Sequence, residues 1–241
     1  MKIINLISGP RNLSTALMYS FAQNKTIKVL DEPFYGYYLA NGNFKVAHPG
    51  TKEILNSLPH SKKQVLEHIN AILKQGNHVF IKGMAHHYLS SEPSHILPWQ
   101  NVILIRHPKK LLASFSKVIK NPSLDDIGIK KAAELFVYLK SQGKTPLVID
   151  SDQLLKNPEG YLHKICNSLE ICFTKDMLSW QKGGMKEDGI WARYWYSNVH
   201  NSTGFAIQKT GRETIPQSLQ SVLNQALIYY TILKTHILKN D

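Results

Sequence analysis

The segment LISGPRNLSTAL, residues 6–17, is the most informative part of the sequence. It follows the apolar opening KIINL and runs directly into STALMYSFAQ, residues 14–23, which has the pattern of a helix. A strand that turns straight into a helix leaves the first N–H groups of that helix unpaired, and such groups bind anions. We therefore interpret the stretch as a phosphate-binding loop between the first strand and the first helix.

The residues of this loop suit an anionic ligand. Arg11 supplies a planar cationic fork, and Ser14 and Thr15 supply hydroxyl donors. The residues that we expect to contact the ligand are Gly9, Pro10, Arg11, Asn12, Leu13, Ser14 and Thr15. The alternative is a helix that follows a proline turn, with Ser14 as an ordinary N-cap.

The loop is not a Walker A motif. The pattern GxxxxGK[ST], counted from Gly9, requires Gly-Lys-Ser/Thr at the positions of Ser14, Thr15 and Ala16. The loop therefore lacks the lysine that reaches nucleotide phosphates and the residue that would hold Mg²⁺. This favours a nucleotide that is handled without a metal ion.

Short apolar runs alternate with helical patterns along the chain. Runs rich in β-branched residues indicate buried strands at 3–7, 26–30, 78–82, 101–105 and 146–150. Apolar spacings of three and four indicate helices at 14–23, 61–75, 109–120, 124–142, 158–171 and 215–238. The alternation predicts a three-layer α/β/α sandwich with a mostly parallel central sheet, formed by residues 1–241 as a single domain. We expect residues 181–214 to form a long ordered loop.

Two of the helical patterns also predict which residues face the core. In the segment 124–142, the expected face is made by Ile129, Ala133, Phe136, Val137 and Leu139/Lys140. In the segment 215–238, the expected stripe is made by Leu219, Val222, Leu223, Ala226, Leu227 and Tyr230.

A second anion site is expected after the strand 101–105. Arg106 follows that strand directly, and Ser114 lies eight residues further on, two turns into the next helix. The guanidinium and the hydroxyl can therefore close on one anion from two sides. The alternative for Arg106 is an ion pair with a neighbouring carboxylate.

The formal net charge of +12 indicates an anionic partner, which could be a small polyphosphate, nucleic acid or an anionic membrane surface. The lysines are scattered, so a solvated lysine-rich surface explains the charge equally well. No apolar run reaches the roughly 18 residues that span a bilayer. Cys166 and Cys172 form no CxxC motif, and no His/Cys/Asp spacing indicates a metal site. A reducing cytoplasm is the simplest location.

Both candidate anion sites resemble those of a known family. The strand–Pro–Arg–x–x–Ser–Thr loop resembles the 5′-phosphosulfate loop of sulfotransferases that use 3′-phosphoadenosine 5′-phosphosulfate (PAPS), and Arg-x-Pro-x5-Ser at 106–114 resembles their 3′-phosphate site. The segment VIDSDQLLKNPEGYLHKICNSLEI, residues 148–171, is similar to the strand, Asp/Glu-x-Leu, Pro and helix that follow in this family. QKGGMKEDGIWAR, residues 181–193, is loosely similar to the cytosolic members' RKGxxGDWK loop.

Three positions depart from the pattern of that family. Leu13 stands where many members have glycine, which would make the loop less open. Arg11 replaces a lysine of the cytosolic branch, although arginine occurs there in bacterial-type relatives. His107 stands where aspartate is common.

The resemblance implies a P-loop NTPase-like fold and the transfer of a sulfuryl group from PAPS to a hydroxyl or amine. The acceptor would be a small molecule or a carbohydrate. Arg11, Ser14 and Thr15 would hold the 5′ end of PAPS, and Arg106 and Ser114 the 3′-phosphate. A sulfuryl group carries less negative charge than a phosphoryl group, so backbone N–H groups and one cation, Arg11, can neutralise the charge that develops. The reaction is therefore expected to need no metal.

The acceptor also needs a base at the strand ends, and two residues qualify. Glu32 follows the second strand, where sulfotransferases of the carbohydrate and bacterial types use a glutamate. His86 follows the third strand, near the Lys-x-His of cytosolic members, but the spacing from Lys82 is longer here. We prefer Glu32. Aromatic residues at 34–38 and 191–196 would line the acceptor cleft, or else belong to the core.

Two other functions remain open at this point. VLDE, residues 29–32, is similar to the end of a Walker B strand and would fit a P-loop kinase or ATPase, but the missing Walker lysine opposes this. The positive charge would fit a nucleic-acid-binding protein, but no RRM, KH or helix-turn-helix signature is present, and we expect no nucleic-acid partner. Nothing in the sequence indicates an oligomeric state.

Overall fold

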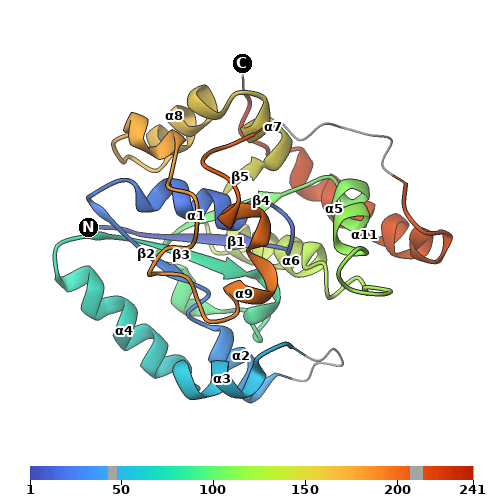
Figure 1. Ribbon diagram of the computed structural model, residues 1–241, viewed down its shortest axis with the longest axis horizontal. Coiled ribbons are helices and arrows are strands. Elements are labelled where there is room, and N and C mark those ends of the chain that lie inside the picture. The colour runs from blue at the N-terminus through green and yellow to red at the C-terminus, as the bar shows by residue number, and fades with distance from the viewer. Residues whose placement is uncertain (43–47, 207–213, 241) are drawn as a thin grey trace.

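The computed structural model describes residues 1–42, 48–206 and 214–240. At its centre lies a five-stranded sheet in the order β2-β3-β1-β4-β5, and every neighbouring pair is parallel (Figure 1). The strands are β1 Ile3–Ser8, β2 Ile27–Asp31, β3 His78–Met84, β4 Gln100–Ile105 and β5 Leu147–Asp150. All five lie at the runs predicted from the sequence.

The central strand β1 shows why these runs are almost continuously apolar. Ile4 and Leu6 pack on one face of the sheet, whereas Ile3 and Ile7 pack on the other, because successive side chains of a strand alternate. Both faces are covered, so both sets are buried. The chain moves from one side of β1 to the other between β3 and β4. Ligands of open α/β sheets bind beside such a switch, at the carboxyl ends of the strands.

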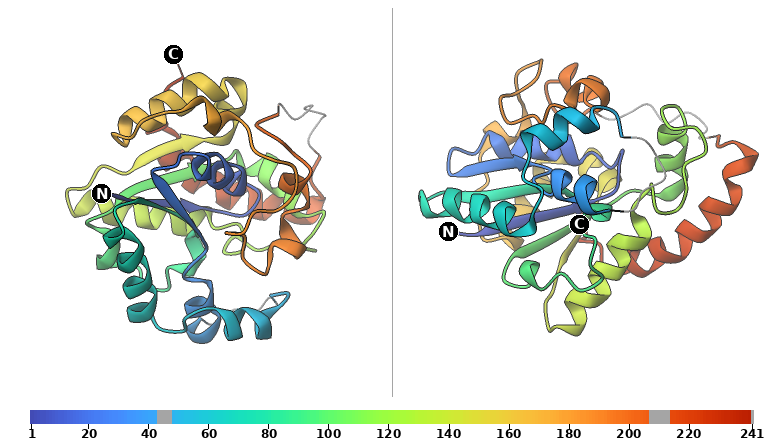
Figure 2. Two further views of the ribbon diagram at one scale, coloured as in Figure 1. Left: turned by 60° about the vertical axis from the view of Figure 1, so that its left-hand side comes forward. Right: turned by 90° about the horizontal axis from the view of Figure 1, so that it is seen from below.

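Helices cover the two faces of the sheet, as Figures 1 and 2 show. The first face is covered by helices α1 and α8, and the second by α4, α5, α6 and α11. The longer helices are α1 Ser14–Ala22, α4 Lys62–Lys74, α5 Pro108–Phe115, α6 Ile129–Ser141, α8 Pro158–Ser168 and α11 Gln220–Lys234. The predicted three-layer α/β/α sandwich is confirmed.

Five short helices were not predicted: α2 Tyr35–Asn41, α3 Thr51–Ser57, α7 Ser151–Lys156, α9 Ala192–Trp195 and α10 Ser197–His200. The structure also has 3₁₀ turns η1 Ala85–His87, η2 Ser94–Ile96, η3 Lys175–Leu178 and η4 Gln217–Leu219. Helices α9 and α10 lie within 181–214, which was expected to be a loop. Residues 207–213 of that segment lie outside the described residues.

The predicted face of α6 is wrong at Val137 and at Lys140, whose side chain is exposed. Ile129, Ala133, Phe136 and Leu139 are buried, but Val137 is 54% exposed. Helix α6 packs against α11 and the sheet, and Val137 lies about 100° around the helix from Phe136. The side chain of Val137 therefore points away from both partners.

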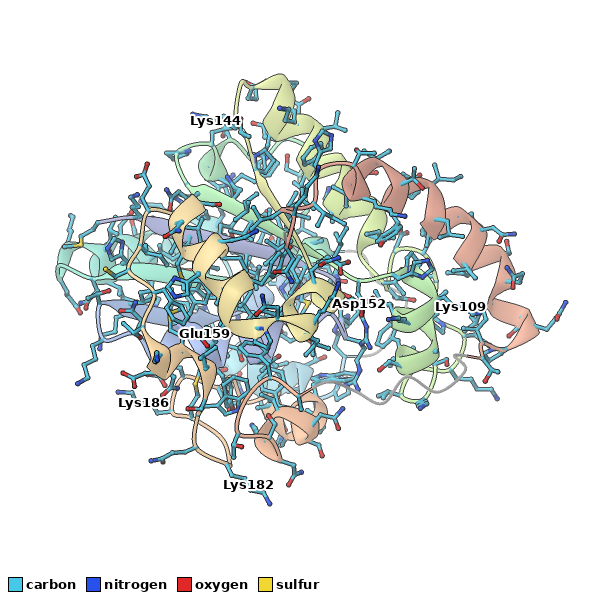
Figure 3. The ribbon with its side chains drawn as sticks, turned by 90° about the horizontal axis from the view of Figure 1, so that it is seen from above. Lys109, Lys144, Asp152, Glu159, Lys182 and Lys186 are labelled. Atoms are coloured by element: carbon cyan, nitrogen blue, oxygen red, sulfur yellow. The ribbon has the colours of Figure 1, made fainter. Side chains whose placement is uncertain are left out.

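The stripe predicted for the C-terminal helix is confirmed in its central part. Leu223, Ala226 and Tyr230 are buried, while Val222 and Leu227 are only partly covered. Among the described residues, no helix has the length and apolar character needed to cross a membrane. Lysines are spread over the molecule, and Figure 3 shows Lys109, Lys144 and Lys182 far apart from one another.

Candidate active site

The loop between β1 and α1 opens into a cavity. Leu13 is the N-cap residue of α1 and adopts a left-handed conformation (φ 68°, ψ 14°), and Arg11 also has a positive φ of 61°. The first helical bond runs from Leu17 N to Leu13 O, so the N–H groups of Ser14, Thr15 and Ala16 precede the hydrogen-bond ladder. These three residues line the cavity. Leu13 and not Ser14 is the N-cap, so the alternative role of Ser14 as a cap is wrong.

Gly9 and Asn12 hold the loop in place. A side chain at Gly9 would lie 2.2 Å from the carbonyl oxygen of Ile127, and Gly9 is not among the residues that line the cavity. Asn12 Nδ2 donates to the Leu104 carbonyl at 3.2 Å, and Ser151 Oγ donates to the Asn12 carbonyl at 2.8 Å. Asn12 does line the cavity. Glycine at position 9 thus lets the loop pack closely against the backbone of Ile127. The Asn12 side chain holds the loop at the end of β4.

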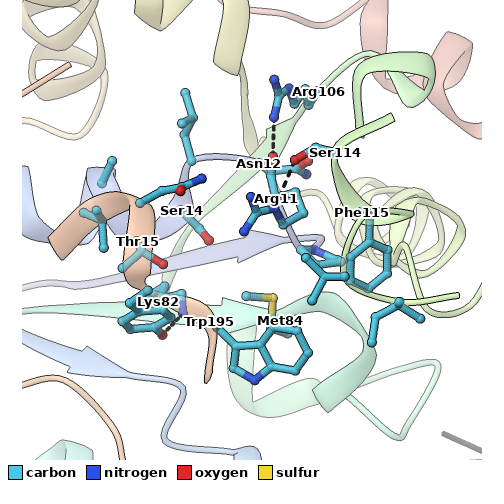
Figure 4. A pocket seen from close by; sticks show the side chains of 18 of the residues that line it. Arg11, Asn12, Ser14, Thr15, Lys82, Met84, Arg106, Ser114, Phe115 and Trp195 are labelled. Carbon is cyan, nitrogen blue, oxygen red and sulfur yellow. Dashed lines mark hydrogen bonds between the residues drawn. The ribbon is translucent and has the colours of Figure 1, made fainter. Parts of the chain in front are cut away.

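Arg11, Arg106 and Ser114 form one cationic wall, drawn in Figure 4. Arg11 Nε donates to Ser114 Oγ at 3.1 Å, and a terminal nitrogen of Arg106 donates to the Arg11 carbonyl at 2.8 Å. Burial and the nearby charge of Arg106 lower the pKa of Arg11. No described carboxylate forms an ion pair with Arg11. Because buried charges in proteins are usually paired, a partly buried guanidinium of this kind can accept an anion.

The cavity has a volume of about 1510 Å³ and is lined by the segments that follow all five strands. One end is the cationic wall described above. The other end is largely aromatic and is lined by Tyr35, Tyr38, His86, His87, Trp191 and Trp195. Of the aromatic residues predicted to line a cleft, Phe34, Tyr37 and Tyr194 do not line the cavity, and Phe34 and Tyr37 pack in the core beside α4.

A buried lysine joins the two carboxylates at the end of β2. Lys82, in β3, is 0% exposed, and its ammonium lies 3.0 Å from Asp31 Oδ1 and in contact with Glu32 Oε1. It also donates to the hydroxyl of Tyr196. These three bonds use all three N–H groups of the lysine. Lys82 is therefore fully occupied by the protein itself.

Asp31 connects this group to the segment beyond β5. The Tyr196 hydroxyl lies 2.8 Å from Asp31 Oδ1 and 2.9 Å from Oδ2, and the Gly189 N–H donates to Oδ2 at 2.9 Å. Trp191 Nε1 donates to the Tyr196 hydroxyl at 3.1 Å. The Lys82 cluster, defined as Lys82, Asp31, Glu32, Tyr196 and Trp191, thus fastens residues 189–196 against the strand ends.

Glu32 has one carboxylate oxygen, Oε2, to which no described residue of the Lys82 cluster donates a hydrogen bond. Its backbone is left-handed (φ 45°) and its N–H donates to the Lys82 carbonyl at 2.8 Å. No described residue donates a hydrogen bond to Oε2, and His87 Nε2 lies 3.8 Å from that oxygen. Burial raises the pKa of Glu32, and the charge of Asp31 adds to this, while Lys82 opposes it.

His86 and His87 form an uncharged aromatic wall. His87 stacks on Tyr35 and Tyr38 at ring distances of 4.6 and 4.9 Å, and His86 meets Tyr38 edge-on at 5.3 Å. Burial, assisted by His48, lowers the pKa of His86 to about 4. Burial also lowers the pKa of His87. Both rings are therefore neutral at physiological pH.

Sequence comparison now identifies the family. A model described as the sulfotransferase domain matches residues 1–237. The chain belongs to the sulfotransferase domain family. Two curated relatives from Arabidopsis thaliana, named branched-chain-amino-acid aminotransferase-like proteins 2 and 1, are each 36% identical to it over 98% of its length. The chain spans 42% of the length of each of these relatives.

Solved sulfotransferase structures share the fold. The sulfotransferase domain from the curacin biosynthetic pathway is 16% identical, with a TM-score of 0.61 over 95% of this chain and 97% of that one. A sulfotransferase from Alicyclobacillus acidocaldarius is 10% identical, with a TM-score of 0.55 over 98% of this chain and 95% of that one. At these identities the likeness concerns the sulfotransferase fold alone.

The structure brings most of the predicted site residues of this sulfotransferase-family chain to one cavity. Its lining includes Pro10 to Thr15, Glu32, His86, Arg106 and Ser114. Lys182, in the segment loosely similar to RKGxxGDWK, is exposed and not part of the lining. Among the described residues, no three His, Cys, Asp or Glu side chains are grouped so that they could hold a metal ion.

The sequence interpretation missed the Lys82 cluster. A lysine inside the apolar run HVFIK, residues 78–82, needs a buried partner, and the two adjacent acids of the neighbouring strand end could have supplied it. The contribution of Tyr196 had no such signal, because it comes from residues more than a hundred positions away.

Removal of the ammonium should destabilise the fold strongly. Lys82→Met leaves two buried carboxylates unpaired and should cost about 3–5 kcal/mol in thermal unfolding at pH 8. Without the ammonium these carboxylates bind protons more tightly in the folded chain than in the unfolded one. The difference in unfolding free energy between the wild type and Lys82→Met should therefore become smaller as the pH falls from 8 to 5.

A matched control is Lys63→Met, because the Lys63 side chain is 86% exposed and its distance to Glu67 is 3.9 Å. This substitution should change the melting temperature little at either pH. Equal melting temperatures for the two variants at pH 8 would show that Lys82 does not hold the site together.

Proposed function

We propose that this protein transfers a sulfuryl group from PAPS to a hydroxyl or amine of a small-molecule or carbohydrate acceptor, without a metal ion. The observation that carries the proposal is the coexistence of a cationic wall and a carboxylate beside aromatic rings in one cavity of about 1510 Å³. Pockets for a single small ligand measure roughly 300–1,000 Å³. The volume therefore suits a nucleotide donor together with an acceptor.

The donor would bind along the cationic wall. The N–H groups at the start of α1, with Ser14 and Thr15, suit the 5′-phosphosulfate, because a helix N-terminus favours negative charge. Arg106 and Ser114 suit the 3′-phosphate. Arg11 bonds to Ser114 in this structure, so the two ends of the donor site form a continuous surface instead of separate pockets.

The reaction needs one proton transfer, the formation of one bond to sulfur and the cleavage of another. As the acceptor oxygen or nitrogen forms a bond to sulfur, the bond between sulfur and the bridging oxygen of the donor breaks. Glu32 Oε2 takes the proton of the acceptor, and 3′,5′-adenosine bisphosphate leaves with the bonding electron pair. Arg11 and the N–H groups of α1 stabilise the charge on that leaving group.

A kinase or ATPase is less consistent with the site. The loop has no Walker lysine, and the nearby Lys82 cannot replace it, because its donors are already bonded to Asp31, Glu32 and Tyr196. Metal independence is part of the proposal and is supported by the low charge of the transferring sulfuryl group. A nucleic-acid partner has no support beyond the net charge of the chain.

Further parts of the proposal concern organisation and location. Residues 1–241 are proposed to act as a single domain, since the family match covers 1–237. A cytoplasmic location is supported by two cysteines that are both free thiols, Cys166 and Cys172.

Binding of the donor's product tests the proposal. By calorimetry at fixed ionic strength, 3′,5′-adenosine bisphosphate should bind more tightly than AMP. Arg106→Ala should reduce that preference about tenfold or more, because a charged hydrogen bond contributes roughly 1.5–3 kcal/mol. Lys109→Ala, which removes an exposed charge on the same helix outside the cavity, should preserve the preference.

If Arg106→Ala weakens both nucleotides equally, Arg106 does not hold the 3′-phosphate. Binding of ADP with Mg²⁺ as tight as that of the bisphosphate would instead favour a kinase.

The identity of the base can be read from pH dependence. With Glu32 as base, Glu32→Gln should lower kcat by about 10²–10⁴, and the wild-type kcat/KM should fall on the acid side at a pH above 4.5. His86→Ala should retain most of the turnover. An acid limb near pH 4, together with loss of activity in His86→Ala only, would assign the base to His86.

A further inference from the structure

The Lys82 cluster contains two carboxylates and one ammonium, and this imbalance has a consequence for the reaction. Lys82, Asp31 and Glu32 are all buried, with exposures of 0%, 7% and 5%. Charges in such surroundings interact more strongly than charges in water. The cluster therefore carries one negative charge in excess whenever both acids are ionised.

The surroundings of the two acids differ. Asp31 accepts from Lys82, from the Tyr196 hydroxyl and from the N–H of Gly189, so both of its oxygens are bonded. Glu32 accepts from Lys82 at Oε1 and lies 3.4 Å from the Tyr196 hydroxyl. Its Oε2 has no donor among the described residues. When two neighbouring acids have such different surroundings, the less bonded one takes the proton.

We propose that Asp31 is a positioning residue for sulfuryl transfer: by sharing Lys82 with Glu32, it keeps the Glu32 carboxylate basic enough to accept the acceptor's proton. This inference rests on the proposed function and extends it to a residue that does not touch the reacting atoms. If Lys82 belonged to Glu32 alone, the pair would be a fully neutralised salt bridge and Glu32 a weak base.

The charges around Glu32 support this assignment. Asp31 from β2 disfavours the ionised form of Glu32, and Lys82 from β3 favours it. His87 from η1 is neutral, and Tyr35 from α2, whose pKa is raised by burial, adds no charge. Tyr196, between α9 and α10, favours the ionised form slightly through its hydroxyl. Asp31 is thus the one charged neighbour among these that makes Glu32 more basic.

The experiment measures the protonation of Glu32 directly, without turnover. The full chain is labelled with ¹³C at the glutamate carboxyl, and the Glu32 resonance is assigned as the one that Glu32→Gln removes. In the wild type its titration midpoint should lie above 4.5. In Asp31→Asn the midpoint should move to lower pH by about one unit, a tenfold fall in proton affinity.

Tyr196→Phe is the matched control for loss of packing. It removes the hydroxyl that bonds to Lys82 and Asp31 but keeps the charge of Asp31. Its Glu32 midpoint should stay above 4.5. If this variant lowers the midpoint as much as Asp31→Asn does, general loosening explains the effect and the inference is overturned. Should Asp31→Asn fail to fold, a wild-type midpoint at or below 4.5 would overturn it equally.

Kinetics separate this inference from the proposed function. The acid limb of kcat/KM with PAPS should move with the carboxyl midpoint in Asp31→Asn. A moved midpoint with an unmoved limb would show that Glu32 is not the base and would overturn the inference. A moved midpoint in a protein that does not turn over PAPS would support the coupling of Asp31 to Glu32 while contradicting the proposed function.

Discussion

The ammonium of Lys82, buried at the end of β3, is the interaction on which the site depends. It gives one hydrogen bond each to Asp31, Glu32 and Tyr196, and so connects two strand ends with the segment around α9 and α10. A charge buried this deeply is tolerated only when all of its donors are satisfied. The hydrogen bonds that Lys82 requires therefore fix the positions of Glu32 and Tyr196 in the lining of the cavity.

The other residues of the site are positioned by the carboxyl ends of the parallel strands. The phosphate loop follows β1 and Arg106 follows β4, so the central pair of strands delivers the cationic wall. Glu32 and His86 follow β2 and β3 on the other side of β1. The change of winding direction at β1 thus separates Arg106 from Glu32 and His86 along the carboxyl edge of the sheet.

The sequence predicted the sheet well because buried parallel strands leave continuous apolar runs. It also placed Arg106 and Glu32 directly after strands and Arg11 in the loop that follows β1, and parallel strand ends meet at one edge. It failed where contacts across the fold decide the structure. The exposure of Val137 depends on which helix packs against α6, and the place of Tyr196 depends on Asp31 and Lys82. Neither relationship leaves a local pattern in the sequence.

A crystal structure of the protein with 3′,5′-adenosine bisphosphate would test the proposed donor site most directly. The 5′-phosphate should lie at the first turn of α1, against Ser14 and Thr15, and the 3′-phosphate on Arg106 and Ser114. The unfilled remainder of the cavity should then face Glu32 Oε2. A nucleotide bound away from the loop at 10–15, or with its 3′-phosphate beside Glu32, would rule out this donor site.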